Sequence, residues 1–285
     1  MASVLHSRFQ EMTPSIQSRR DAFAALHRSG CFVLPNPWDA GSARYLESLG
    51  FKALATTSSG YAWSQGRADG SVPREVVLSH LRTIVEATPL PVNADFEAGY
   101  AKDAAGVAQS VRMAIDTGVA ALSIEDSTYD DRKPLRDIDD GVKRMRAART
   151  AIDESRTGTL LVGRAENFLV GHPDLDDTIR RLKAYSEAGA DCLYAPGIRT
   201  REQIAAVVAA VAPKPVNLLI GSTSEFTLKE VEAMGVRRVS VGGALARCAW
   251  AGFMRAARTI ASDGRFDGFA GAASGKELNE LFADR

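Results

Sequence analysis

The sequence is poor in cysteine and carries no excess of charge of either sign. Its 285 residues contain 3 cysteines, and Lys plus Arg balance Asp plus Glu at 35 each, so the formal net charge is zero. A neutral chain has no general electrostatic affinity for nucleic acid or for an anionic membrane. The cysteines stand far apart, without a Cys-x-x-Cys pair, so neither a zinc–thiolate site nor a disulfide framework is indicated.

Long apolar runs are also missing. The sequence has no apolar run of about 18 residues, the length that a membrane-spanning helix needs. Its first residues lack the apolar centre of a signal peptide, so we expect a soluble cytoplasmic protein. No Gly-x-Gly-x-x-Gly follows an apolar run, which leaves a dinucleotide-binding fold without support.

Short apolar segments, in contrast, recur eight times. Each is bounded by Gly, Pro, Asn or Asp, as is typical of buried parallel strands. The predicted strands are residues 31–34, 53–57, 92–95, 122–125, 160–164, 192–195, 216–220 and 238–242.

The segments between these strands have the signals of helices. We predict helices over residues 16–28, 74–87, 104–117, 173–189, 227–235, 244–262 and 276–282. Asp103 is a candidate N-cap, and glycines such as Gly118, Gly189 and Gly235 stand at helix ends just before strands. Alternating strands and helices predict a (β/α)₈ barrel, with a doubly wound open sheet as the alternative.

The domain prediction is one α/β barrel over residues 1–285. A helical lead-in occupies residues 1–29, the barrel residues 30–243, and extra helices residues 244–285. This C-terminal segment is longer than a barrel requires, so we expect it to pack on a partner subunit.

Carboxylates gather at the ends of two neighbouring strands. Asp95 and Glu97 follow the third strand, and Glu125 ends the fourth. The chemistry of a barrel lies at the C-terminal ends of its strands, so these groups would meet in one mouth. Without a cation they would repel one another, and Mg²⁺ prefers oxygen ligands. A solvated acidic loop is the alternative interpretation.

Residues for binding an anion are found at the ends of other strands. Arg164 ends the fifth strand, where its guanidinium can bind a carboxylate through two hydrogen bonds, or can serve as an ion-pair partner of Glu166 or Glu125. Ser58, Ser59 and Gly60 offer hydroxyl and backbone N–H donors, although their segment also reads as a simple polar turn.

Other polar residues are assigned from position alone. Asn217 lies inside the seventh strand, where a polar side chain is either paired or functional. Asp126 should point away from Glu125, because adjacent strand residues face opposite sides. His27 and His80 fall on predicted helices, where we expect them at the surface.

No lysine stands at the C-terminal end of any predicted strand. A Schiff-base aldolase needs a lysine inside its pocket, so that mechanism is disfavoured. Stabilisation of an enolate by a metal ion is the remaining route that the residues suggest.

Several motifs together resemble the isocitrate lyase/phosphoenolpyruvate mutase superfamily over residues 30–257. Asp-Phe-Glu-Ala-Gly-Tyr at 95–100 is similar to the family's Asp-x-Asp-x-Gly-Tyr, and Asp69 resembles the aspartate after the second-strand loop. The other matches are Pro-Asn-Pro-Trp-Asp-Ala-Gly-Ser-Ala at 35–43, Ser-Ile-Glu-Asp at 123–126 and Gly-Arg-Ala-Glu-Asn-Phe at 163–168.

The resemblance implies an α/β barrel that forms a homodimer or homotetramer by exchanging its last helix. It implies Mg²⁺ or Mn²⁺ near Asp95, with Glu97, Asp69 and Glu125 acting directly or through water. It also implies that Arg164 and the backbone of residues 58–61 hold a small 2-oxo or 2-hydroxy acid. The substrate-binding set that we predict is Trp38, Ser58, Ser59, Gly60, Tyr61, Arg164 and Asn217.

The loop after the fourth strand departs from the family pattern. The carbon–carbon lyases carry Lys-x-Cys-Gly-His there, with the cysteine as acid and base, whereas residues 127–135 contain neither Cys nor His. The phosphonate branch carries a Lys and an Asn in a longer loop, and only Lys133 is present here. Glu97 also replaces the family's usual aspartate.

These residues predict a metal-dependent lyase acting on a small 2-oxo or 2-hydroxy carboxylate through an enolate. Asp69 and Arg164 are candidate catalytic residues, and Tyr129 or Lys133 is the candidate proton donor. The alternatives are phosphorus–carbon chemistry on phosphonopyruvate or phosphoenolpyruvate, and a barrel that binds a 2-oxo acid without catalysis.

Overall fold

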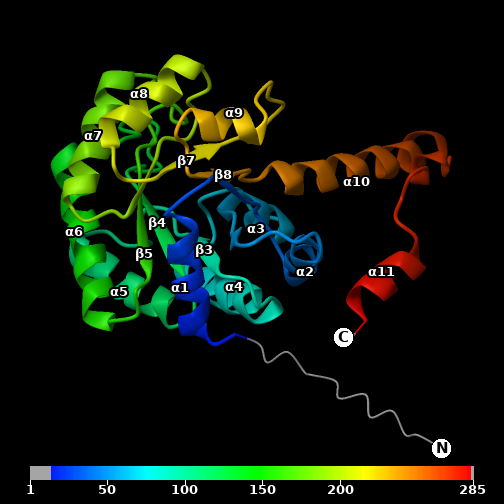
Figure 1. Ribbon diagram of the computed structural model, residues 1–285. Coiled ribbons are helices and arrows are strands. Elements are labelled where there is room, and N and C mark those ends of the chain that lie inside the picture. The colour runs from blue at the N-terminus through cyan, green and yellow to red at the C-terminus, as the bar shows by residue number, and fades with distance from the viewer. Residues whose placement is uncertain (1–13, 284–285) are drawn as a thin grey trace, which may run out of the picture.

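A computed structural model describes residues 14–283, so the first residues of the predicted lead-in lie outside the described part. Eight parallel strands form one sheet in the order β1-β8-β7-β6-β5-β4-β3-β2. They are β1 Phe32–Leu34, β2 Leu54–Ala55, β3 Val92–Asp95, β4 Ala121–Glu125, β5 Leu160–Arg164, β6 Cys192–Tyr194, β7 Val216–Leu219 and β8 Arg238–Ser240. The predicted (β/α)₈ barrel is therefore confirmed (Figure 1).

The barrel is nearly closed between its first two strands. A single backbone hydrogen bond of 3.0 Å runs there from the Ala55 N–H to the Pro35 carbonyl. Elsewhere the register places the ends of the strands side by side, with Asp95 beside Ser123 and Glu125 beside Arg164. The carboxyl ends of β3, β4 and β5 thus share one rim.

Helices alternate with the strands around the outside of the barrel (Figure 1). They are α1 Ile16–Leu26, α2 Ala40–Ser48, α3 Ser58–Ser64, α4 Arg74–Ala87, α5 Ala104–Ile115, α6 Ile138–Ser155, α7 Leu175–Glu187, α8 Arg201–Val211, α9 Leu228–Ala233, α10 Ala244–Asp263, the 3₁₀ turn η1 Asp267–Phe269 and α11 Gly275–Phe282.

The helix ends follow the capping signals of the sequence. The Asp103 side chain accepts from the Gly106 N–H at 2.8 Å and starts α5. Gly118 and Gly189 take φ angles of +90° and +106°, which glycine adopts without a Cβ clash. Helix α7 begins two residues later than predicted, because Asp174 caps it through the Asp177 N–H.

The apolar core lies between the strands and the outer helices. Leu81 and Ile84 of α4, Val111 of α5 and Leu122 of β4 are fully buried there. The inside of the barrel is unusually polar by comparison, since branched apolar side chains normally fill that space. Its buried polar side chains include Asn93, Ser123, Asn217, Arg238 and Ser240.

Helix α1 closes the end of the barrel opposite the rim. Its Phe23 is fully buried and packs with Leu34 and Ala55. Arg19 donates to the Val85 carbonyl at 2.8 Å, and Arg20 donates to the Ile115 carbonyl at 2.9 Å. These carbonyls lie near the C-termini of α4 and α5, where a cation is favoured. The two arginines therefore fix α1 against the base of the barrel.

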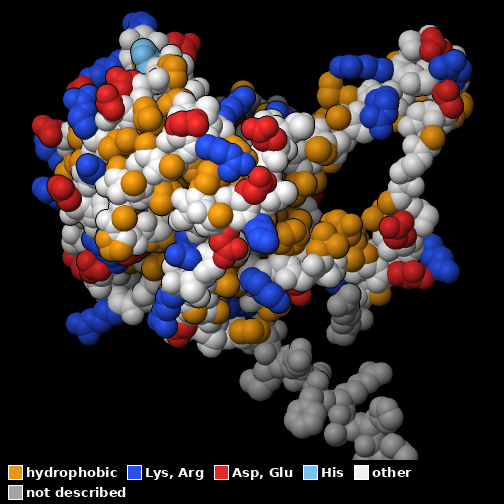
Figure 2. Space-filling view, turned by 45° about the horizontal axis from the view of Figure 1, so that its top comes forward, with side chains coloured by type: hydrophobic (Ala, Val, Ile, Leu, Met, Phe, Trp, Pro, Cys, Tyr) orange, Lys and Arg blue, Asp and Glu red, His pale blue; other side chains and the backbone are white. Residues whose placement is uncertain are grey.

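The C-terminal segment extends away from the barrel. Helix α10 projects outward and α11 turns back, so that the arm surrounds an open space (Figures 1 and 2). Only Ala246 of α10 is buried, and the exposed apolar side chains of the arm include Trp250, Phe253 and Phe266. Among the described residues, no helix is long and apolar enough to cross a membrane.

Candidate active site

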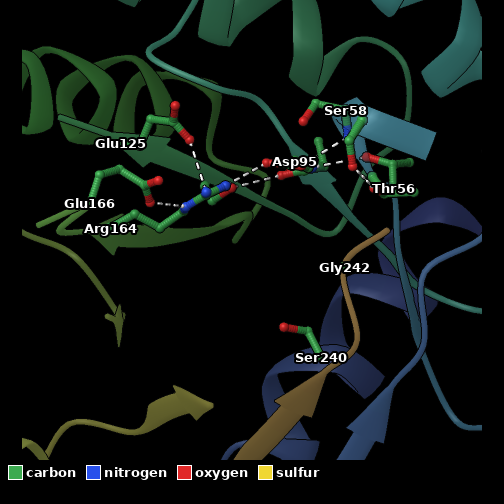
Figure 3. Close-up of polar contacts among 12 residues, drawn as sticks. Thr56, Ser58, Asp95, Glu125, Arg164, Glu166, Ser240 and Gly242 are labelled. Atoms are coloured by element: carbon green, nitrogen blue, oxygen red, sulfur yellow. Dashed lines mark hydrogen bonds and ion pairs between the residues drawn. The ribbon is translucent and has the colours of Figure 1, made fainter. Parts of the chain in front are cut away.

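Arg164 is the centre of an ion-pair cluster at the rim of the barrel. Its Nη1 lies 2.7 Å from Asp95 Oδ1, and its Nη2 lies 3.1 Å from Glu125 Oε2. Its Nε lies 2.9 Å from Glu166 Oε1. Figure 3 shows the three carboxylates converging on the guanidinium from β3, β4 and the segment after β5. These acids raise the pKa of Arg164 well above its usual value against the opposing effect of burial.

Asp95 is held by the end of β2 as well as by Arg164. The Ser58 N–H donates to Asp95 Oδ2 at 2.9 Å, and the Asp95 N–H donates to Thr56 Oγ1 at 2.9 Å. The Ser58 donor belongs to the first turn of α3, where backbone N–H groups lack partners within the helix. The predicted anion-binding donor is thus directed at an aspartate of the protein.

Tyr129 connects the loop after β4 to the loop between α3 and α4. Its hydroxyl donates to Glu125 Oε1 at 2.7 Å. Its ring lies against Gly70, where an added Cβ would come within 2.8 Å of two ring atoms. Burial and the Glu125 charge raise the pKa of Tyr129, so the hydroxyl keeps its proton at neutral pH.

Two further carboxyl groups complete the cluster. Burial raises the pKa of Glu97 to about 7, and the charges of Asp95 and Asp69 add to this effect. The same causes, burial first and then Asp95, raise the pKa of Asp69. Burial also raises the pKa of Glu125 and of Glu166. Three carboxylates therefore contact the guanidinium, and the carboxyl groups of Glu97 and Asp69 lie within electrostatic range of Asp95.

This donor set fits a hard divalent cation. The excess of negative charge is the electrostatic requirement for such an ion, and all five groups offer oxygen. Within residues 14–283, no three Asp, Glu, His or Cys side chains converge closely enough to form a complete ligand set. A cation held here would therefore take only one or two carboxylates directly and water for its remaining ligands, as Mg²⁺ does in many proteins.

The predicted anion-binding segment lies in α3 instead of in a turn. Thr57 caps this helix by accepting from the Gly60 N–H at 3.3 Å. Ser58 and Ser59 line the cavity at the rim. The Tyr61 ring is directed elsewhere and stacks on His80 at a centroid distance of 3.6 Å.

Three other predicted residues lie apart from the Arg164 cluster. Trp38 is half-buried beside Gly60 and contributes no side-chain hydrogen bond there. Asn217 is fully buried deeper in the barrel, where it donates to Ser240 Oγ at 2.9 Å. Lys133 is exposed and pairs with Asp137 at 2.8 Å.

Asp126 faces away from Glu125, as predicted. Its Oδ1 accepts from the Glu166 N–H at 2.9 Å, and its Oδ2 accepts from Arg181 at 3.0 Å and from the Tyr185 hydroxyl at 2.6 Å. Asp126 therefore positions Glu166 behind the cluster.

The expectation for two histidines was wrong. His80 is buried with 6% of its surface exposed, and His27 is half-buried against Phe23. Burial lowers the pKa of both to about 4. Both helices pack these positions inward, which the sequence spacing did not reveal.

Two connected cavities open at the rim. The smaller, about 150 Å³, contains Asp95 and Arg164 at the strand ends and Asn93, Asn217 and Arg238 further in. The larger, about 710 Å³, extends over the loops after β6, β7 and β8. It includes the side chains of Arg199, Ser222, Thr223 and Arg247, and it shares Ser59, Asp69 and Gly243 with the smaller cavity.

Comparison with known proteins now identifies the family. The model of the phosphoenolpyruvate phosphomutase family matches residues 23–261. The chain belongs to this family. The resemblance to the isocitrate lyase/phosphoenolpyruvate mutase superfamily is thereby confirmed.

The relatives of this chain include proteins named as a decarboxylase, as a lyase or mutase, and as a hydrolase. An oxaloacetate decarboxylase from Paraburkholderia xenovorans (strain LB400) is 32% identical over 250 residues, which cover 84% of this chain and 79% of the relative. A solved candidate lyase or mutase from Burkholderia cenocepacia J2315 is 46% identical with a TM-score of 0.90, covering 94% of this chain and 97% of that one. Oxaloacetate acetylhydrolase, solved with its product oxalate, is 28% identical with a TM-score of 0.81 and coverage of 93% and 94%.

Sequence reasoning on this phosphomutase-family chain missed several residues of the site. Glu166 was weighed only as an ion-pair partner of Arg164. Other polar groups that line the cavity, namely Asn93, Ser123, Tyr194, Arg238 and Ser240, were not singled out. A signal was present, because Asn93 and Ser123 stand two residues before Asp95 and Glu125 and so face the same side.

Proposed function

We propose that this protein is a metal-dependent lyase acting on a small 2-oxo or 2-hydroxy carboxylate. The observation that carries the proposal is the cluster at the rim, in which three carboxylates contact Arg164 and those of Glu97 and Asp69 lie within electrostatic range of Asp95. Such a site can hold a divalent cation together with an acid that chelates it. The cation would supply a positive charge to stabilise negative charge that develops on a substrate oxygen.

The chain's own residues have separate tasks in this proposal. Asp95, with Glu97, Asp69 and Glu125 beside it, would hold the cation directly or through water. Arg164 would bind the carboxylate of the acid, for which its fork-shaped guanidinium is suited.

A proton is required after the bond to the departing fragment breaks, because the electron pair left on carbon forms an enolate. Tyr129 is the better placed of the two candidate donors, since its hydroxyl lies on Glu125 inside the cluster. Lys133 points to solvent from the same loop. We therefore assign the donor role to Tyr129 Oη.

The test is a substrate panel with Mg²⁺: oxaloacetate, methylisocitrate and phosphonopyruvate. We expect turnover of a carbon–carbon substrate, abolished by EDTA and reduced roughly 100-fold or more by Asp95→Asn. Asp139→Asn, which changes an exposed aspartate in the first turn of α6, is the control and should retain turnover.

Two outcomes would contradict the proposal. Turnover of phosphonopyruvate alone would favour phosphorus–carbon chemistry. Turnover of none of the three, together with a Mg²⁺-dependent rise in melting temperature on adding oxalate, would favour a barrel that binds the acid without catalysis.

We also propose that the protein forms a homo-oligomer through its C-terminal arm. Helix α10 has 20 residues and buries only Ala246, and isolated helices depend on tertiary packing for their stability. Trp250 and Phe253 form an exposed edge-to-face pair at 5.5 Å. Figure 2 shows apolar side chains gathered where the arm leaves the barrel, which suits a second copy of the chain.

Light scattering coupled to size exclusion tests this assembly. The native chain should elute as a dimer or tetramer, and Phe253→Asp should shift it towards the monomer. A native chain that is monomeric at micromolar concentration would rule the assembly out.

A further inference from the structure

Arg238 is a buried cation without a counter-ion. It begins β8, only 2% of its surface is exposed, and it makes no ion pair with any acid in residues 14–283. Other buried arginines pair with carboxylates, as Arg181 and Arg144 do, or donate to carbonyls at helix C-termini, where a cation is favoured, as Arg19 and Arg20 do.

Only neutral groups face the Arg238 guanidinium. Its Nε donates to Asn217 Oδ1 at 2.9 Å, and its Nη1 and Nη2 both lie 3.2 Å from Asn93 Oδ1. Its Nη1 also lies 3.4 Å from His27 Nε2, and the Phe23 ring is 6.0 Å away. Burial lowers the pKa of Arg238, and no carboxylate opposes that effect.

The positive charge of Arg238 is not balanced by a negatively charged side chain among its hydrogen-bond partners. Amide oxygens satisfy hydrogen bonds, but they carry only partial charge, and a full charge in a low-dielectric interior is costly unless it is paired. An uncharged residue at this position would avoid that cost. The buried charge of Arg238 therefore calls for a compensating interaction.

A space suited to such an interaction adjoins the guanidinium. Arg238 lines the cavity of about 150 Å³ together with Asn217, Ser240 and Ser123. Figure 3 shows Ser240 on β8, apart from Arg164 and Asp95, and all three residues line this cavity. The cavity accepts a small ion or one carboxylate, and it is well below the size of pockets for larger ligands.

We propose that Arg238, with Ser240 and Asn217 beside it, binds a small monoanion inside the barrel, below the Arg164 cluster. The required chemistry is one negative charge on a compact group, such as a halide, formate or the carboxylate arm of an acid bound at the rim. Arg238 and Ser240 have no role in the lyase activity proposed above, whereas Asn217 belongs to the predicted substrate-binding set, so the version in which the arm of a bound acid occupies the site rests on that proposed function.

Thermal denaturation at constant ionic strength tests the site without any turnover. Chloride, bromide or formate should raise the melting temperature saturably by roughly 2–6 °C, and gluconate, which is too large, should not. Equal melting temperatures in all four sodium salts would overturn the proposal.

A second test keeps Arg238 and introduces a negative charge beside it by mutation. Asn93→Asp places a carboxylate on the atom that already accepts from the guanidinium. This variant should be as stable in gluconate as the native chain is in chloride, and it should lose the anion response. An Asn93→Asp chain that still responds would contradict the assignment.

Competition distinguishes the source of the anion. If the site receives the arm of a bound diacid, chloride should weaken Mg²⁺-dependent binding of oxaloacetate and leave oxalate, which has no arm, unaffected. If a free ion is the occupant, chloride should leave both affinities unchanged while the thermal response remains. Either result supports an anion at Arg238.

Discussion

The Tyr129 hydroxyl donates a 2.7 Å hydrogen bond to Glu125, which is also paired with Arg164. One tyrosine from the loop after β4 is thus joined to the ion-pair cluster of the rim. Tyr129→Phe should lower kcat roughly 100-fold or more, the usual contribution of a general acid, and leave the melting temperature nearly unchanged. Steady-state kinetics and thermal denaturation measure the two effects.

Lys133→Met is the control for that prediction, since it lies in the same loop and is exposed. It should retain native turnover. If Lys133→Met is the inactive variant and Tyr129→Phe is active, the proton donor has been assigned to the wrong side chain.

Gly70 allows Tyr129 to reach Glu125. A Cβ at Gly70 would lie 2.8 Å from the ring, and the φ angle there is +74°. Gly66 has a similar φ of +66° and open space around it. Both Gly→Ala changes should cost about 1 kcal/mol of unfolding free energy from backbone strain, but only Gly70→Ala should also reduce kcat. Equal kcat values for the two variants would show that the contact does not matter.

Glu97 should make the metal-free protein less stable as pH rises. Its folded pKa of about 7 lies above the unfolded value, so the native state binds the proton more tightly. The stability of native relative to Glu97→Gln protein should therefore fall between pH 4.5 and 7, by at most about 3 kcal/mol. Urea unfolding in EDTA measures this difference, and Mg²⁺ should reduce it; a difference that rises with pH would refute the assignment.

His80 should make the protein less stable as the pH falls, which is opposite to the effect of Glu97. Burial lowers its folded pKa to about 4, so the unfolded chain binds more protons between pH 4 and 6.5. Stability relative to His80→Gln should fall by up to about 3 kcal/mol as the pH drops through that range. The comparison uses urea unfolding at both ends of the range. A pH-independent difference would mean that His80 ionises freely in the folded state.

The elements of the fold were predictable because their signals are local. Strand β3 was predicted with its observed bounds, and so was α4, since apolar runs and capping residues lie within a few positions. No helix was predicted at Ser58–Ser64, because Ser-Ser-Gly are weak helix formers and the Thr57 cap decides the outcome.

The site was predictable where strand ends alone determine it. Asp95, Glu125 and Arg164 meet because the register of a parallel sheet puts their strand ends together. The contact between Tyr129 and Gly70 depends on two loops whose paths no local pattern specifies. The span of Arg238 across the barrel to Asn93 likewise depends on tertiary packing.

Helix α1 packs against the base of the barrel, and this limits the routes by which ligands enter and leave. In residues 14–283, Phe23 is buried at the base and Arg19 and Arg20 are anchored to neighbouring helices, while the cavity inside the barrel opens at the rim. A molecule that enters by this opening leaves by it too, so a fragment released deep in the cavity would leave after, or together with, the part held at Arg164 near the rim. The order of product release is therefore set by the architecture of the barrel as much as by the affinities of its side chains.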